Sequence, residues 1–443
     1  MRKLFFASFL TIFILALHLN KVDAQTVCNV GSATGNDTQK IQNAIDSCAG
    51  GGEAKLSSGE TYTAGTIVLK SGVTLNLNSS TIQASDNEND FISCKEGSTR
   101  NFFICTRAKT DSVVITGPGA LTKTLGSKVD HSMVEFWNSS NLTVKNLTID
   151  TTMADKTVSG FHLNTAASNN ILFESITVRG GRAGGQVWGN DGIHLQGSQN
   201  VTVRNCDIST HDDGIPIPAS SGEGARNVLV EDCVVSSDSS ALKFGTGSSD
   251  KWDGITFRNI TIKNTNVAIG FAVYDGGEVS NVIYDNITVE SDVKVLFACG
   301  GGAAGLGGMK DCAGPVDRDG DGVKETPGGY IHDVTFQNFE IFGGGSSTSH
   351  GEASLNTMDR VTLKNINFHE GSGTAPLAWF RDICGLSISG FTSHLTGDPT
   401  KDMQIDSKCY QFKAGWRYAK LWGCRFYSHS YFQTSSYRRF RRR

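Results

Sequence analysis

The sequence predicts an all-β protein folded as a right-handed, single-stranded parallel β-helix, in which short strands coil into a solenoid. The main evidence is a motif of alternating apolar residues that recurs at a constant period, starting at Asn200, Asn227, Gly254 and Asn281. No repeat contains a helical apolar pattern of about ten residues, which excludes a βαβ fold. Glycine is frequent (51 of 443 residues) and proline is rare (7), as is typical of a chain with many tight turns. Since one repeat cannot bury its own apolar face, the repeats must stack on one another.

The extent of the motif indicates a single solenoid domain. The motif also starts at Ser112, Asn141, Asn170, Asp333, Arg360 and Gly385. We therefore expect about ten coils between residues 72 and 394, ~4.8 Å apart, within one domain over residues 25–394. The step from residue 281 to residue 333 is nearly two periods long, so a segment at about 299–328 is expected to be an insert.

The two ends of this solenoid are expected to differ. A short capping helix is predicted after Asp37, its expected N-cap residue. The helix has one apolar stripe, which consists of Ile41, Ala44, Ile45 and Cys48. The repeat is lost after about residue 394, and the chain ends in a basic run over residues 438–443. Residues 395–443 are therefore predicted to form an irregular C-terminal segment with a basic tail.

The N-terminal segment has the pattern of a secretory signal peptide. Arg2 and Lys3 precede an apolar run over residues 4–19, and residues 22–24 offer a small-residue cleavage site. We therefore predict a signal peptide over residues 1–24 and a secreted, extracellular protein with no membrane contact after cleavage. The net charge of −4 gives no reason to expect a nucleic-acid partner. A monomer is the default for a capped solenoid.

Export agrees with the cysteine content of the chain, because disulfides persist in oxidising compartments. Cysteines near one another in sequence are expected to pair as Cys28–Cys48, Cys94–Cys105 and Cys299–Cys312. Cys206 and Cys233 are one period apart and are expected to stack as buried thiols. Acceptor motifs for N-glycosylation occur at Asn36, Asn78, Asn138, Asn141, Asn146, Asn200, Asn259 and Asn286. Several of these asparagines coincide with the turns of the repeat, so a structural role competes with glycosylation there.

Three carboxylates are expected to gather on one face of the solenoid. Asp191 precedes the coil that starts at Asn200, and Asp213 precedes the next coil, with Asp212 beside it. Any single Asp-Gly pair is ordinary turn chemistry. A cluster at matching coil positions is different, because clustered carboxylates repel one another and tend to be tolerated where they have a function. Glycoside hydrolysis needs one protonated and one ionised carboxyl group, so this cluster is a candidate catalytic centre.

These residues resemble glycoside hydrolase family 28, the polygalacturonase and rhamnogalacturonase group. The family carries an Asn-Thr-Asp-Gly segment and, about one coil later, an Asp-Asp pair. Residues 189–192 (Gly-Asn-Asp-Gly) and 211–214 (His-Asp-Asp-Gly) are similar to these two segments. The resemblance covers roughly residues 28–394. It implies that Asp212 is the general acid, that Asp191 and Asp213 activate water for an inverting displacement, and that the substrate is a pectic polysaccharide.

The chain also departs from the family pattern. The position of the family histidine holds Ser240, and that of its Arg-x-Lys motif holds residues 268–270 (Ala-Ile-Gly). A lysine often found after the Asp pair is replaced by Pro218. Lys243 is the nearest remaining cation and is a candidate for substrate binding, although a solvated strand-end lysine is the alternative. Because these residues are absent, a rhamnogalacturonan-type polysaccharide stays an alternative to a polygalacturonan as the expected substrate.

Other candidate substrate-binding residues flank the Asp cluster. His194 and His211 are close to it in sequence, and Trp188 offers an aromatic face for a sugar ring. For His194 a structural role is the competing interpretation.

No cofactor is implied, and one weak metal motif is present. Asp317, Asp319 and Asp321 have the spacing of a calcium loop, but position 12 of that loop is Gly328 and not glutamate. An ordinary polar loop is the alternative. Two other functions also remain open for the whole chain: a polysaccharide lyase on the same fold, or an inactive glycan-binding relative.

Overall fold

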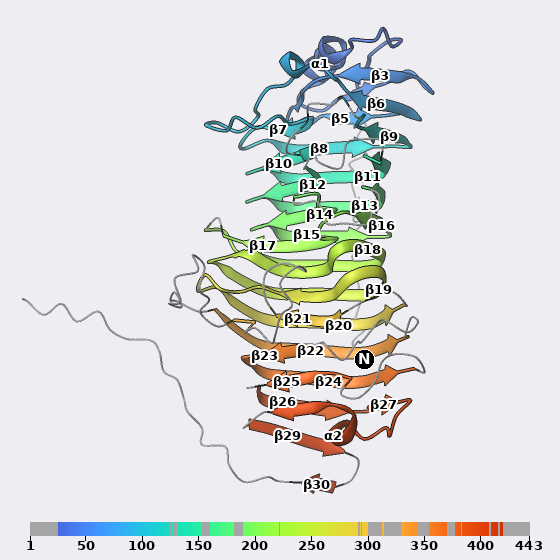
Figure 1. Cartoon of the computed structure of the whole chain (residues 1–443). Coiled ribbons are helices and arrows are strands. Elements are labelled where there is room, and N and C mark those ends of the chain that lie inside the picture. The colour runs from blue at the N-terminus through green and yellow to red at the C-terminus, as the bar shows by residue number, and fades with distance from the viewer. Residues whose placement is uncertain are drawn as a thin grey trace, which may run out of the picture.

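The computed structural model describes residues 25–124, 126, 129, 132–152, 160–180, 189–220, 222–290, 293, 295–299, 312–313, 329–342, 354–369, 377–381, 383–406, 409–414 and 417–419. The expected signal peptide and most of the expected insert lie outside these residues. Within them the chain forms a parallel β-solenoid of about 11 turns, close to the ten predicted. The coils stack in chain order from the N-terminal to the C-terminal end (Figure 1).

The strands belong to three sheets, and all but one of their pairings are parallel. The 22-stranded sheet contains β1 (Val27–Asn29), β2 (Glu53–Lys55), β3 (Thr61–Ala64), β5 (Thr74–Asn76), β6 (Ser80–Ala84), β8 (Asp111–Thr116), β9 (Gly119–Thr122), β11 (Ser140–Asp150), β13 (Asn169–Arg179), β15 (Gln199–Arg204), β16 (Asp207–Thr210), β17 (Ile215–Ala219), β18 (Ala225–Ser248), β19 (Lys251–Phe271), β20 (Glu278–Val289), β21 (Val295–Cys299), β22 (Tyr330–Ile341), β24 (Met358–Phe368), β26 (Cys384–Ser389), β27 (Thr392–Ser393), β29 (Cys409–Ala414) and β30 (Arg417–Ala419). The five-stranded sheet contains β4 (Ile67–Leu69), β7 (Ile104–Thr106), β10 (Ser132–Trp137), β12 (Phe161–Ala166) and β14 (Ile193–Gln196). The three-stranded sheet contains β23 (Ser354–Asn356), β25 (Trp379–Arg381) and β28 (Gln404–Asp406).

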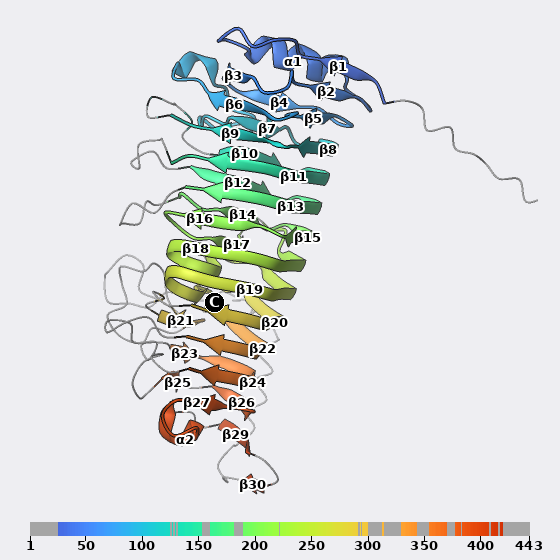
Figure 2. The ribbon, with the colours of Figure 1, turned by 90° about the vertical axis from the view of Figure 1, so that its right-hand side faces the viewer.

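Three short helices complete the described structure. They are α1 (Thr38–Ser47), the 3₁₀ helix η1 (Glu88–Asp90) and α2 (Pro399–Asp402). Helix α1 lies across the N-terminal end of the solenoid, and α2 lies near its other end (Figure 2). Among the described residues, we find no helix with the length and apolar character needed to cross a membrane.

The strand register confirms the repeat that the sequence predicts. Val201 pairs with Val228, Val228 with Ile255, and Ile255 with Val282, so one period of the sequence is one turn of the solenoid. Val282 then pairs with Val334, so the insert leaves the register of the solenoid intact. The parallel pairing also continues past residue 394, because β28 and β29 stack on β25 and β26. The sequence repeat is not recognisable in this last coil, and the domain boundaries themselves stay a prediction.

The predicted capping helix is present, with one difference at its start. Its buried residues are Ile41, Ala44 and Ile45, as the apolar stripe predicts, and the Cys28–Cys48 disulfide ties its end to β1. Asp37 occupies the N-cap position, but its carboxylate makes no capping bond to the helix. It accepts hydrogen bonds from the backbone N–H groups of Thr34, Gly35 and Thr63 instead.

The core contains columns of aromatic rings at equivalent positions of successive coils. Tyr284 stacks between Phe257, at 4.9 Å between ring centroids, and Phe336, at 5.0 Å. All three are fully buried. Equivalent residues of successive coils lie over one another. An apolar residue that recurs at one position of the repeat therefore forms a continuous core.

The cysteines behave as the sequence predicts. The three expected disulfides are formed: Cys28–Cys48, Cys94–Cys105 and Cys299–Cys312. Cys206 and Cys233 are free and buried, and the backbone N–H of Cys206 donates to Sγ of Cys233 at 3.4 Å.

Asparagines at the turns form a ladder along the outside of the solenoid. Nδ2 of Asn170, Asn200 and Asn227 each donates to Oδ1 of the asparagine one coil earlier, at 3.0, 3.2 and 3.0 Å. These residues have a left-handed backbone, with φ of 54° at Asn200, which asparagine tolerates better than most residues. The ladder therefore accounts for the asparagines at the acceptor motifs Asn141 and Asn200 without glycosylation.

Replacing one ladder asparagine should destabilise the protein measurably. Asn200→Ala forces alanine into the left-handed region and removes ladder hydrogen bonds on both sides, so we expect a loss of about 2 kcal/mol. Asn200→Gly keeps the backbone conformation and should lose only about half as much. Urea unfolding midpoints of the two variants test this. Equal losses in both would show that the backbone conformation contributes nothing.

Candidate active site

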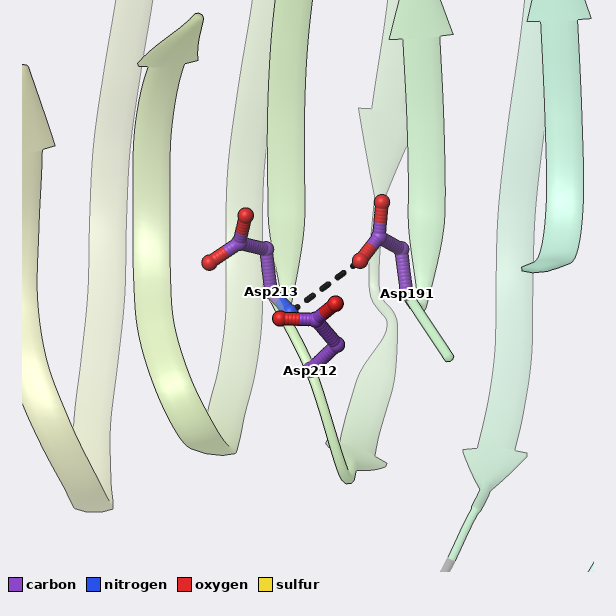
Figure 3. Close-up of side chains that lie close together, drawn as sticks. All are labelled: Asp191, Asp212 and Asp213. Atoms are coloured by element: carbon purple, nitrogen blue, oxygen red, sulfur yellow. Dashed lines mark hydrogen bonds between the residues drawn. The ribbon is translucent and has the colours of Figure 1, made fainter. Parts of the chain in front are cut away.

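The structure brings the three predicted aspartates together at one corner of adjacent coils. Asp191 directly precedes Gly192 and β14, while Asp212 and Asp213 lie in the turn between β16 and β17. The backbone N–H of Gly192 donates to the carbonyl oxygen of Asp213 at 2.9 Å, which fixes the two turns side by side. Ligand atoms of the three carboxylates all lie within 4.8 Å of one another. Figure 3 shows the three side chains gathered at this corner.

The glycine after each aspartate allows this close approach. A Cβ atom on Gly192 would lie 2.5 Å from the carbonyl oxygen of Gly214, and one on Gly214 would lie 2.7 Å from that of Ala241. Such contacts are sterically impossible, so only glycine permits the coils to stack at these turns. The glycine of each Asp-Gly pair is thus required by the close stacking of the two turns.

Asp191 is buried and bound on both of its oxygens. Its Oδ1 accepts from the backbone N–H of Asp213 at 3.2 Å (Figure 3), and its Oδ2 lies 2.6 Å from Nδ1 of His194. Burial raises the pKa of the Asp191 carboxyl above its ordinary value, with a smaller upward contribution from the charge of Asp213. The hydrogen bond and charge of His194 act in the opposite direction.

Asp213 is paired with the one lysine that sequence analysis selected. Nζ of Lys243 lies 2.6 Å from its Oδ2, and its Oδ1 accepts from Ser239 Oγ at 2.8 Å and from the Ser240 N–H at 3.1 Å. The Lys243 side chain is only 9% exposed. Burial would lower the pKa of Lys243, but the neighbouring carboxylates outweigh burial and raise it. Lys243 is therefore a buried ammonium group within the site and not a solvated strand-end lysine.

The strand register places Lys243 between Pro216 on the previous coil and Gly270 on the next. A Cβ on Gly270 would lie 3.5 Å from Cγ of Lys243, which is ordinary van der Waals contact, so the lysine stem lies close against this glycine.

Asp212 has its own backbone donor. Its Oδ2 accepts from the N–H of Gly189 at 2.6 Å, and the residue is 5% exposed. Asp212 therefore differs from its two neighbours: among the contacts described for the site, the histidine is on Asp191 and the lysine is on Asp213.

The three carboxylates line an open pocket with a volume of about 410 Å³. Lys243 and His194 line it as well, as predicted. The wall also includes Phe161, whose ring stacks on His194 at 4.2 Å between centroids. Sequence analysis missed Phe161, although the signal was present: the register that pairs Leu163 with Ile193 places Phe161 one coil before Asp191.

The remaining predicted residues are His211, Trp188 and the calcium-loop candidates. His211 is buried with Nδ1 3.1 Å from Asp238 Oδ2, on the following coil, and is not among the described residues that line the pocket. Trp188 lies outside the described residues. So do the calcium-loop candidates Asp317, Asp319 and Asp321, and both suggestions stay predictions.

Comparisons with known proteins match this chain to one family. Residues 48–295, more than half of the chain, match the family described as Glycosyl hydrolases family 28. An endo-polygalacturonase of Pectobacterium carotovorum subsp. carotovorum is 28% identical over 223 residues, which are 44% of this chain and 54% of that protein. The chain thus spans about half the length of this curated relative.

Solved structures show the same fold. The family 28 exopolygalacturonase of Yersinia enterocolitica superposes with a TM-score of 0.66 at 16% identity, over 88% of this chain and 78% of that one. A polygalacturonase from Erwinia carotovora ssp. carotovora gives 0.59 at 16% identity, over 88% and 97%. The matched region includes Asp191, Asp212 and Asp213. This chain is therefore a member of glycosyl hydrolases family 28.

Proposed function

We propose that the protein is a glycoside hydrolase that cleaves a pectic plant cell-wall polysaccharide by a single, inverting displacement. The observation that carries the proposal is the cluster of three buried carboxylates, Asp191, Asp212 and Asp213, at the wall of an open pocket. Family membership and the endo-polygalacturonase relative support the same reaction class.

The three carboxyl groups have distinct roles in this mechanism. Asp212, in its protonated form, gives its proton to the glycosidic oxygen as the bond to the anomeric carbon breaks. Asp191 and Asp213 hold a water molecule on the opposite face of the sugar, and one of them accepts its proton as the water oxygen bonds to that carbon. The ammonium of Lys243 beside Asp213 supports an ionised carboxylate there. The leaving sugar ends as an alcohol and the new reducing end has inverted configuration.

The pocket also supports a second candidate, a rhamnogalacturonan-type substrate. The ammonium of Lys243 is engaged by Asp213, so the described lining residues leave little positive charge for a galacturonate carboxylate. Three carboxylates face the same space and would repel such a group. A backbone with uncharged sugars between its uronates would meet less repulsion beside the catalytic residues.

The cellular context is part of the proposal. A signal peptide over residues 1–24 would deliver a secreted monomer whose partner is the polysaccharide alone. Glycosylation is expected only at acceptor motifs outside the asparagine ladder, such as Asn36, which is exposed.

Product analysis on two polymers tests this proposal. The chain without residues 1–24 is incubated with polygalacturonan and with rhamnogalacturonan, and new reducing ends are measured. We expect release from at least one polymer, with saturated products. Unsaturated sugar ends would identify a lyase instead. No release by a folded protein would favour a glycan-binding relative without activity.

The pH dependence of the reaction gives a further prediction. The raised pKa of Asp191 means that its base form is lost at a higher pH than for an ordinary aspartate, so kcat/KM should fall early on the acidic side. His194 counteracts this shift. His194→Phe keeps a ring against Phe161 but removes the hydrogen bond, so the acidic limb should move to higher pH. An unchanged limb would show that Asp191 does not control it.

A further inference from the structure

A second pocket adjoins the catalytic pocket on its N-terminal side. It has a volume of about 310 Å³, and it shares Phe161 and Gln196 with the catalytic pocket. Glu135 of β10 and Asn164 of β12 line it. Glu135 pairs in register with Asn164, and Asn164 pairs with His194 of β14. These three side chains therefore follow one line across the five-stranded sheet, from the second pocket into the first.

The inner wall of this pocket consists of buried hydrogen-bonding groups. Glu135 and Asn164 are only 4% and 3% exposed. Oε2 of Glu135 accepts from Ser132 Oγ and from Asn164 Nδ2, both at 2.7 Å. Within the described part of the chain, Oδ1 of Asn164 has no hydrogen-bond partner. A buried acceptor without a donor is costly. Oδ1 of Asn164 has almost no accessible surface, so a ligand hydroxyl would reach it only after a small shift of the pocket wall.

The chemistry of this wall favours hydroxyl groups over carboxylates. Carboxylate and amide oxygens accept hydrogen bonds, and a sugar hydroxyl can donate to them. An ionised uronate carboxylate has no proton to donate to these oxygens. Lys95 and Glu96 also line the pocket and carry opposite charges. Phe161, between the two pockets, offers an apolar ring to the C–H face of a sugar.

We propose that this second pocket is a glycan subsite selective for an uncharged sugar unit, whose hydroxyl donates to Oδ1 of Asn164 while Glu135 fixes the orientation of the amide. The uncharged unit is a neutral sugar or an esterified uronate. The inference rests on the proposed function, since it assumes that a pectic chain lies across both pockets. It goes further by naming the kind of unit bound next to the catalytic residues.

Binding measurements on a catalytically inactive variant test the subsite. Asp212→Asn protein is titrated calorimetrically with oligogalacturonate, with its fully methyl-esterified counterpart of the same length, and with a rhamnogalacturonan oligosaccharide. We expect at least one uncharged-unit ligand to bind about tenfold more tightly than the free acid. Adding Asn164→Ala should remove most of that preference, as expected for one lost hydrogen bond in a buried site.

Two controls separate a local effect from a general one. Asp207→Asn changes an exposed carboxylate that is not among the described lining residues of either pocket and should leave the preference unchanged. A disaccharide that fills only the catalytic pocket should bind the Asn164→Ala variant as it binds the parent, which also checks that the site is folded. Equal affinity for free acid and esterified oligomers, or a preference that survives Asn164→Ala, would overturn the subsite. So would a lack of binding by all three ligands.

The two proposals fail in different ways. Turnover of the same oligosaccharides by the protein with Asp212 intact is measured separately. A binding preference that depends on Asn164, without any turnover, would contradict the hydrolase and leave the subsite standing. Turnover without the binding preference would support the hydrolase and contradict the subsite.

Discussion

Asp212→Asn should lower kcat by about 10²–10⁴-fold while leaving the fold intact, because the leaving sugar then departs without general-acid assistance. Asparagine has nearly the same shape and can still accept the hydrogen bond from the Gly189 N–H. Because the mechanism requires Asp212 to be protonated, an uncharged asparagine should change the charge of the cluster little. The thermal unfolding midpoint should therefore stay nearly the same.

A second substrate can assign the acid role itself. A glycoside with a strongly acidic leaving group needs little protonation, so the Asp212→Asn variant should lose much less activity on it. Asp191→Asn should lose activity on both substrates, because water activation is still required. A matched control is Asp207→Asn, an exposed residue on the same coil that pairs with Arg179. Equal sensitivity of the Asp212→Asn variant to both substrates would contradict the assignment of the acid.

The fold could be predicted from the sequence because every coil must bury apolar residues at the same positions against its neighbours. Val201, Val228 and Ile255 each fill the same layer of the core, so their constant spacing was enough to give the register. The coil formed by β28 and β29 was missed because its register shifts: Cys384 pairs with Cys409, but Leu386 pairs with Tyr410, so the apolar positions no longer keep one spacing. Backbone pairing continues there without the side-chain pattern that reveals it.

The site was only partly predictable, for a related reason. Asp191 and Asp213 could be found because each precedes the start of a coil, and Lys243 could be found as the nearest remaining cation. The second pocket combines Glu135 with Asn164, which occupy equivalent positions on neighbouring coils but are chemically unlike, so no repeat of residue type marked them. His211 is adjacent to Asp212 in sequence, yet its ring lies beside Asp238 on the next coil, which its sequence position did not indicate, and its role in substrate binding stays a prediction.

Lys243→Met should destabilise the protein by about 3–5 kcal/mol, the usual cost of leaving one partner of a buried ion pair without its counter-charge. Lys243 and Asp213 are 9% and 7% exposed, so solvent cannot replace the lost ammonium easily. The matched control is Lys251→Met on the next coil, where the lysine is 61% exposed and pairs with Glu278; its loss should cost less than about 1 kcal/mol. Urea unfolding of both variants measures the difference.

A double substitution separates the ion pair from simple packing. If the cost of Lys243→Met comes from the unpaired charge of Asp213, then adding Asp213→Asn should recover most of the stability, because both charges are then absent. Activity should not recover, since Asp213 is also needed to hold and activate water. A double variant as unstable as Lys243→Met alone would show that the lysine stem fills space between Pro216 and Gly270 and that its charge matters little. The same pair of groups would thus be required for two reasons. Lys243 balances the charge of the buried carboxylate, and the carboxylate engages the only lysine among the described lining residues of the catalytic pocket.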